Sequence, residues 1–195
     1  MPRTTRLSAV LVFASLLGGC AAQSRFMRPG AEFPPVPSDA ARVVFIRPSS
    51  FAFGVVVTIV DSEGRFIGDS SAKSRFAASL PAGEYTFVAW GEGTHSLKAN
   101  IVAGRTYYVE VAPVLGVWSA RFHLKAIKAT TRNWPNLQVW LRDTSPRDVL
   151  QEEGQAYVAG RREAADDAIR KGVARFAEYN AEETDDRTLE PDDGT

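Results

Sequence analysis

Short strand-like segments that alternate with turn signals dominate the chain between residues 42 and 128. Each segment is apolar or alternates apolar and polar residues, and turns containing glycine or proline, such as 61–64, 81–83 and 103–104, separate them. Turns about every 8–12 residues, with no helix-length interruption, are typical of an antiparallel sandwich and disfavour a parallel βαβ fold. The expected strands span residues 42–47, 55–60, 65–69, 73–80, 85–90, 96–101, 106–111 and 118–126.

The same segment indicates how such a fold is stabilised. Leu97, Ala99 and Ile101 alternate with polar neighbours, which is the pattern of a strand with one face in a core. The chain has one cysteine, so an intrachain disulfide is impossible. A segment of about ninety residues can bury enough apolar surface to fold without a disulfide. We therefore predict a mainly β domain over residues 42–128, an antiparallel β-sandwich of about eight strands.

Three stretches of this domain resemble a family of small bacterial lipoproteins known as domain of unknown function 2846. They are VVFIRPSSFAFG (43–54), LPAGEYTF (80–87) and AGRTYYVEV (103–111). The Pro-Ala-Gly-Glu-Tyr turn is also similar to turns of prealbumin-like and carboxypeptidase regulatory-like sandwiches. The resemblance implies a prealbumin-like or immunoglobulin-like sandwich, and it implies no enzymatic activity.

The first nineteen residues have the order of a secretory signal peptide. Arg3 and Arg6 supply the positive start, residues 7–17 are apolar, and two glycines follow. The apolar run is too short for a membrane-spanning helix, which needs about 20 apolar residues. We therefore predict that residues 1–19 are removed.

The residues that end this segment, Leu17-Gly18-Gly19-Cys20, resemble the lipobox of bacterial lipoproteins. The resemblance implies cleavage between Gly19 and Cys20, a diacylglycerol on the Cys20 thiol and a fatty acyl group, such as palmitate, on its new amino group. Several acyl chains anchor a protein stably, whereas one holds it only marginally. Ala21 follows in place of aspartate, which favours the outer membrane. The expected location is the bacterial cell envelope, anchored by lipid.

Four further segments complete the chain. Residues 20–41 are rich in proline and small residues and predict an extended tether. Residues 129–144 form a mixed connector. Ser145, Pro146 and Asp148 suit a helix start, so residues 145–182 are predicted as an amphipathic helix. The acidic residues 183–195 lack periodicity and predict a disordered tail.

The predicted helix has an apolar stripe that fits two interpretations. Val158, Ile169 and Phe176 recur at helical spacing on one face. The stripe either binds another protein or packs on the open face of its own sandwich.

Apolar loops of the sandwich also fit two interpretations. Phe51 and Phe53 lie between two strands, and Trp118 precedes the last one. They either form an exposed partner surface or plug the ends of the core.

No group of residues forms a recognisable catalytic set. His95 and His123 are the only histidines, and without further cysteines they are too few for a zinc site, so we expect solvated histidines and no metal or cofactor. No Gly-x-Ser-x-Gly elbow occurs. The adjacent carboxylate pairs, expected as surface charges, are Asp61 with Glu63 and Asp166 with Asp167. The formal net charge of zero gives no reason to expect nucleic-acid binding.

The sequence therefore predicts a lipid-anchored envelope protein that acts as a non-catalytic binding or structural module for a protein or glycan partner. One alternative is an envelope hydrolase with a site built from scattered residues. Another is a carbohydrate-binding module that uses Trp90, Trp118 or Tyr108.

Overall fold

The computed structural model describes residues 22–91, 93–115 and 120–195, and this part of the chain is mainly β with a helical C-terminal segment. The strands are β1 (Met27–Pro29), β2 (Ala41–Arg47), β3 (Val57–Asp61), β4 (Phe66–Ser70), β5 (Ser74–Leu80), β6 (Gly83–Trp90), β7 (His95–Ile101), β8 (Thr106–Leu115), β9 (Ala120–Ile127), β10 (Ser145–Val149) and β11 (Thr188–Leu189). The helices are α1 (Leu137–Asp143), α2 (Gln151–Ala159), α3 (Arg162–Phe176) and α4 (Ala181–Asp185), with 3-10 turns η1 (Trp134–Asn136) and η2 (Pro191–Asp193).

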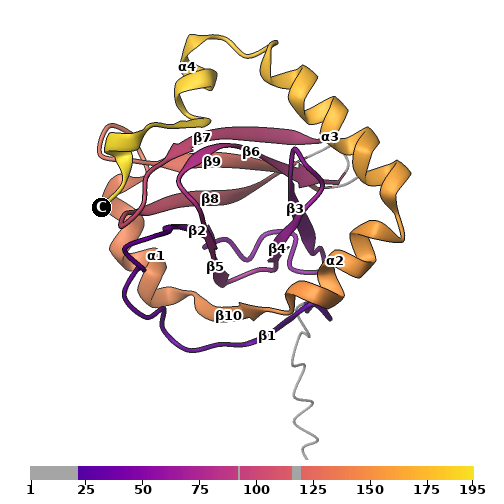
Figure 1. The fold of residues 1–195 in the computed structure, drawn as a ribbon, viewed down its shortest axis with the longest axis horizontal. Coiled ribbons are helices and arrows are strands. Elements are labelled where there is room, and N and C mark those ends of the chain that lie inside the picture. Colours follow the sequence, from indigo (N-terminus) through magenta and orange to yellow (C-terminus); the bar gives the residue numbers. More distant parts are fainter. Residues whose placement is uncertain (1–21, 92, 116–119) are drawn as a thin grey trace, which may run out of the picture.

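Within the described residues the strands form two sheets that enclose the main core (Figure 1). One sheet has the order β1-β10-β5-β2-β8-β9 and the other β11-β7-β6-β3-β4. Between them Phe45 stacks on Phe76 at 5.1 Å and meets Phe87 edge-on at 5.3 Å. Strands β2 to β9 correspond to the eight strands that the sequence predicts, so the mainly β fold and the C-terminal helix are confirmed.

The sheets are mixed, so the expectation of a purely antiparallel sandwich is wrong. Strand β2 pairs parallel to β8, β5 pairs parallel to β10, and β7 pairs parallel to β11. Neighbouring hairpins such as β6–β7 and β8–β9 are antiparallel, because a short turn reverses the chain. The parallel partners are far apart in sequence, so no turn dictates their direction.

The predicted helix of residues 145–182 begins later and is broken. Residues 145–149 form strand β10, because proline at 146 pushes Ser145 away from the α conformation and the edge of β5 offers unpaired backbone groups. Ser145 donates its backbone N–H to the Lys73 carbonyl at 2.9 Å. Helices α2, α3 and α4 then follow as separate elements.

Helices α2 and α3 cover the outer face of the five-stranded sheet, as Figure 1 shows. A second core joins Val60, Phe66 and Val88 of the sheet to Val158 and Ala165 of the helices. The apolar stripe is part of this packing: Val158 is 1% exposed, Phe176 is 9% exposed, and Ile169 packs against the same cluster. The interpretation of Val158, Ile169 and Phe176 as a partner-binding surface is therefore wrong, because their own sheet buries them.

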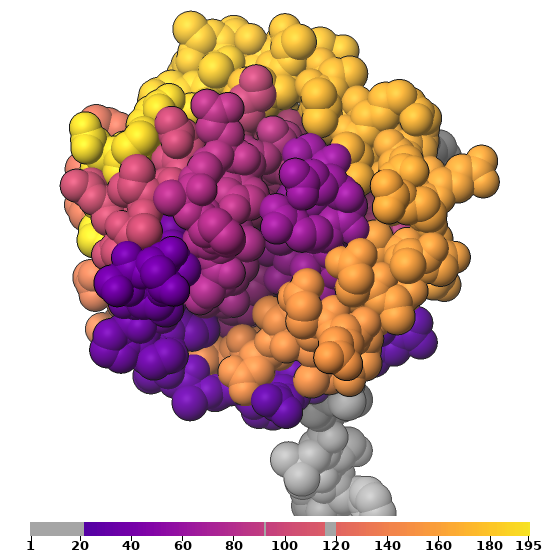
Figure 2. Space-filling view, in the orientation of Figure 1, coloured from indigo at the N-terminus to yellow at the C-terminus, as the bar shows by residue number. Residues whose placement is uncertain are grey.

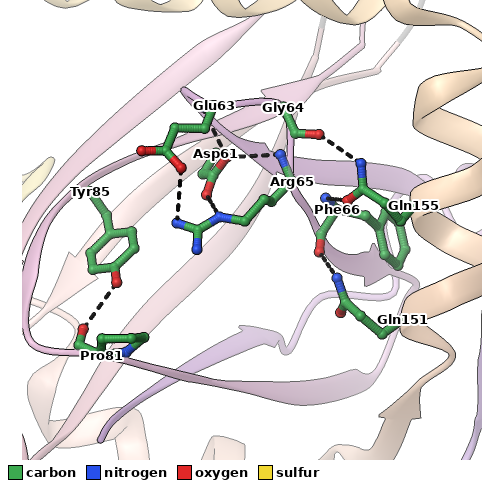
Figure 3. A network of polar contacts seen from close by, with 9 residues as sticks. All are labelled: Asp61, Glu63, Gly64, Arg65, Phe66, Pro81, Tyr85, Gln151 and Gln155. Atoms are coloured by element: carbon green, nitrogen blue, oxygen red, sulfur yellow. Dashed lines mark hydrogen bonds and ion pairs between the residues drawn. The ribbon is translucent and has the colours of Figure 1, made fainter.

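Two glutamines of α2 bind the backbone of edge strand β4 and the turn before it (Figure 3). Gln151 donates to the Phe66 carbonyl at 2.6 Å, and Gln155 accepts from the Phe66 N–H at 2.8 Å while donating to the Gly64 carbonyl at 3.1 Å. These bonds occupy polar groups that an edge strand otherwise leaves open. The helix thus seals this edge of the sheet.

The acidic C-terminal residues 183–195 are folded, which corrects the predicted disordered tail. Strand β11 extends the edge of β7 in this segment, and Leu189 is fully buried. The ammonium of Lys128 lies 2.8 Å from Asp185 and is itself buried. Hydrogen bonds to a sheet edge and a buried cation therefore order a sequence whose composition alone predicts disorder. The orange and yellow C-terminal residues form a continuous cover in Figure 2.

The described part of residues 20–41 is likewise packed on the domain, so the predicted free tether is wrong. Strand β1 pairs with β10, and Phe26 is 9% exposed between Phe66 and Tyr157. The guanidinium of Arg42 binds the Pro35 carbonyl at 3.2 Å. Apolar and backbone contacts therefore hold the segment against the sandwich.

Replacing Gly154 with alanine should destabilise the protein, because a Cβ there would overlap the ring of the buried Phe66. We expect the free energy of unfolding to fall by about 1–3 kcal/mol, the usual cost of overpacking. Gly160→Ala is the matched control, since its Cβ meets the helix's own backbone no closer than 3.4 Å. Urea unfolding measures both variants, and equal stabilities would contradict the close approach of α2 to β4.

Candidate functional site

Two of the predicted contact residues lie on the surface at one end of the sandwich. Phe51 and Phe53 occupy the turn that follows β2, and 44% and 56% of their surfaces are exposed. Neither side chain therefore plugs the core. Trp118, Cys20 and Gly19, which the sequence also singles out, lie outside the described residues.

A buried arginine holds this loop in shape. Arg47 ends β2 and has no exposed surface, and its guanidinium lies 4.6 Å from the centre of the Phe122 ring. Burial lowers the pKa of Arg47 to about 10, so the side chain is still charged at neutral pH. Its acceptors are the carbonyl oxygens of Ala52 (2.7 Å), Val55 (2.7 Å), Phe51 (3.0 Å) and Ser70 (3.4 Å).

The loop also fixes itself from within. Ala52 has a φ of +56°, in the left-handed region, and its carbonyl accepts from the Val55 N–H at 2.9 Å. The Ser49 hydroxyl accepts from the Phe51 N–H at 3.0 Å. Because internal bonds and Arg47 hold the same backbone, the aromatic side chains are presented outward on a defined frame.

The β8–β9 hairpin ends beside this loop. Strands β2 and β8 are parallel, so the loop after β2 and the end of β8 lie at the same end of the sandwich. Phe122 of β9 lies against Arg47 and pairs with Pro113 of β8. Leu115, two residues after Pro113 at the end of β8, has 84% of its surface exposed. We call Phe51, Phe53, Val55 and Leu115 the apolar end.

The N-terminal segment enters the fold at the same place. Ala22 donates its backbone N–H to the Phe53 carbonyl at 3.0 Å. The chain then continues to Phe26, which is buried, and into β1. The start of the described chain is thus fastened to the aromatic loop.

A cleft of about 330 Å³ lies beside this entry point. Exposed Arg25 and Arg161 flank it, and each guanidinium lies over the Tyr157 ring, at 5.6 Å and 4.2 Å. Asp69 is buried in its wall and accepts from the Ser24 hydroxyl at 2.5 Å. Burial raises the pKa of Asp69, whereas the Ser24 hydrogen bond opposes that shift. The accessible charges of the cleft are therefore the two cations.

The two histidines, His95 of β7 and His123 of β9, lie side by side, which sequence reasoning missed. The rings of His95 and His123 are 3.8 Å apart, and His95 is only 5% exposed. The expectation of solvated histidines is wrong, because the C-terminal segment covers them. Tyr179 lies 2.9 Å from the Nδ1 of His95, and Arg187 lies 3.1 Å from the Nδ1 of His123.

The surroundings of the histidine pair favour the neutral form of both rings. Burial, followed by the neighbouring His123, lowers the pKa of His95 to about 3. Burial, followed by the charge of Arg187, lowers the pKa of His123 to about 4. Since arginine can only donate, the Nδ1 of His123 is the acceptor in their contact. The arrangement latches the C-terminal segment onto the sandwich.

The other predicted polar residues are dispersed. Asp61 is 1% exposed and accepts the backbone N–H groups of Glu63 and Arg65, so it is a buried turn residue and not a surface charge (Figure 3). Trp90 packs on the outer face of one sheet and Tyr108 on that of the other. These two aromatic residues therefore do not share a carbohydrate-binding platform.

Comparison with known proteins leaves the geometry as the basis for function. No family model, curated protein or solved structure matches the chain. In the described part of the chain, no three His, Cys, Asp or Glu side chains gather in a way that could hold a metal ion. Among those residues, no helix combines the length and apolar composition needed to cross a bilayer.

Replacing Arg47 with methionine should destabilise the protein and loosen the loop, because buried carbonyls lose a charged donor. We expect the free energy of unfolding to fall by about 2–4 kcal/mol, together with faster amide exchange at Val55. The matched control is Arg142→Met, since Arg142 is 73% exposed and should change stability by less than about 0.5 kcal/mol. Unchanged exchange at Val55 would contradict the bracing role.

The histidine pair should make the protein less stable as pH falls. Unfolded histidines titrate near pH 6.5, whereas the folded ones do so near 3 and 4, so between these values the unfolded chain binds more protons. Each histidine then lowers the free energy of unfolding by up to about 1.4 kcal/mol per pH unit. Comparing His123→Gln with the natural chain by urea unfolding at pH 4.5–7.5 isolates this effect from the carboxylates. The variant should show a shallower slope, and parallel curves would refute the assignment.

Proposed function

We propose that the protein is a lipid-anchored protein of the bacterial cell envelope, held by an acylated Cys20 after removal of residues 1–19. The proposal is supported by the signal-like order of the first twenty residues and by contacts of the chain just after Cys20. Ala22, two residues after Cys20, is already bonded to Phe53, and residues 26–29 are packed on the domain. Cleavage between Gly19 and Cys20 would thus leave every described contact in place, and the lack of aspartate at position 21 favours the outer membrane.

We infer that the folded domain is a prealbumin-like sandwich that serves as a non-catalytic binding or structural module. The eight central strands, arranged as β5-β2-β8-β9 facing β4-β3-β6-β7, support the fold class. The histidine pair supports a non-catalytic role, because Tyr179 and Arg187 of the C-terminal segment occupy the Nδ1 atoms of the two rings and cover them. In the cleft between Arg25 and Arg161, Asp69 is the one carboxylate among the described lining residues. Glycoside hydrolysis generally uses a pair of carboxylates.

The partner of this module would be a protein or a glycan of the envelope. It would bind a face of the domain that is turned away from the membrane. Crosslinking in living cells, followed by identification of the neighbours, tests this part. A variant with a substitution at an exposed position elsewhere on the surface, such as Val139→Ser, is the control. It should recover the same neighbours as the natural chain.

Replacing Cys20 with alanine should abolish lipid attachment. We expect the natural protein to sediment with membranes and to show a mass that begins at Cys20 with fatty acyl additions, because several acyl chains anchor a protein stably. The variant should lack the acyl mass and keep residues 1–19. A natural protein with no acyl addition, or one that keeps its first nineteen residues, would overturn the proposal.

A further inference from the structure

We infer that the apolar end lies directly on the lipid bilayer, with Arg25 and Arg161 directed toward anionic headgroups. This inference rests on the proposed anchor at Cys20. It differs from the idea of a domain lifted away from the membrane, because here the domain itself contacts lipid through a fixed surface.

The short chain between Cys20 and Ala22 limits how far the anchor can lie from the folded domain. Residue 20 precedes Ala22 by two residues, and an extended chain spans at most about 3.6 Å per residue. The Cα of Cys20, to which the acylated groups are attached, therefore lies within about 7 Å of the Cα of Ala22, whose N–H is bonded to the Phe53 carbonyl. Whatever surface receives the acyl chains must lie next to the aromatic loop.

The surface next to the anchor is apolar and exposed. Phe51, Phe53, Val55 and Leu115 expose between 39% and 84% of their surfaces, although Arg47 and the loop's own bonds keep the backbone rigid. Exposed apolar side chains gathered at one end of a domain mark an interaction site. Phenylalanine and leucine side chains of surface-bound proteins insert into the boundary between headgroups and acyl chains. The exposed apolar side chains of the apolar end are therefore suited to contact with a bilayer surface.

Two exposed arginines lie beside the N-terminal segment. Arg25 and Arg161 are exposed on the cleft next to the N-terminal entry, and Asp69 in the same wall is buried away from solvent. Cations close to a membrane are attracted to anionic lipids. The positive rim and the apolar loop therefore favour the same face of the molecule toward the bilayer.

The proposed anchor leaves little room beside the loop for another protein. A protein that covered Phe51 and Phe53 would have to fit between the domain and the membrane, because the anchoring Cys20 is two residues from Ala22, which is bonded to the Phe53 carbonyl. Lipid of the same membrane can contact this surface without any such fitting. A bilayer is therefore the occupant that the position of the loop favours.

A lipid-depth measurement tests the inference on the intact, acylated protein. Because the Cys20 thiol is consumed by the anchor, Phe53→Cys would carry the one free thiol for an environment-sensitive fluorophore. Ala82→Cys is the matched control: it is exposed in the β5–β6 turn, and Leu80 beside it pairs with the first residue of β2, about 20 Å from Arg47 at the other end. Phe51→Cys repeats the test independently.

The proteins are placed in vesicles of phosphatidylethanolamine and phosphatidylglycerol that contain nitroxide-labelled lipid. We expect the label at 53 to be quenched at least threefold more than the label at 82, and the difference to shrink when Arg25 and Arg161 are changed to glutamate. Equal quenching at 53 and 82 on an acylated protein overturns the inference and leaves the anchor standing. Quenching at 53 in vesicles combined with crosslinking of 53 to a protein in cells also overturns it, in favour of a protein partner. An intact mass without acyl groups removes the anchor and the inference together.

Discussion

A guanidinium removed from water needs acceptors for its N–H groups, and in this protein the two terminal nitrogens of Arg47 find most of theirs in the loop that follows its own strand, whereas its Nε has no partner among the described residues. Four carbonyls and the Phe122 ring surround it. Desolvating a charge is costly, so the site is stable only with all partners in place. That requirement ties the end of β2, the aromatic loop and the β8–β9 hairpin into one rigid end of the sandwich. The exposure of Phe51 and Phe53 is a consequence of this bracing.

Close packing of helices α2 and α3 on the sheet, together with hydrogen bonds further along the chain, holds the C-terminal segment in place. Gly154 and Gly172 let α2 and α3 lie directly on Phe66 and Val88, where a Cβ would be crowded. Beyond the helices, Arg187 holds the segment in place: its guanidinium contacts His123, and its backbone carbonyl accepts a hydrogen bond from the Lys98 N–H at 2.9 Å. Backbone pairing of β11 with β7 completes the cover. The helices therefore belong to the domain and do not form a separate arm.

The N-terminal segment changes what a lipid anchor would mean here. A free tether of twenty residues would let the domain sample many orientations above a membrane. Because Ala22 and Phe26 are instead attached to the sandwich, the anchor would fix which end of the domain faces the lipid. The same contacts that stabilise the fold thus set its orientation in the proposed function.

The sequence alone determined the eight central strands, because their alternation and turns are local properties that need no distant partner. It also singled out Phe51 and Phe53 and the signal order of the first twenty residues. Tertiary structure alone decided that β2 lies parallel to β8 and that 145–149 is a strand. It alone ordered the acidic end and brought His95 to His123. These outcomes depend on sheet edges and buried charges that attract segments far away in the chain, and such long-range pairings leave no periodic pattern in the residues that form them.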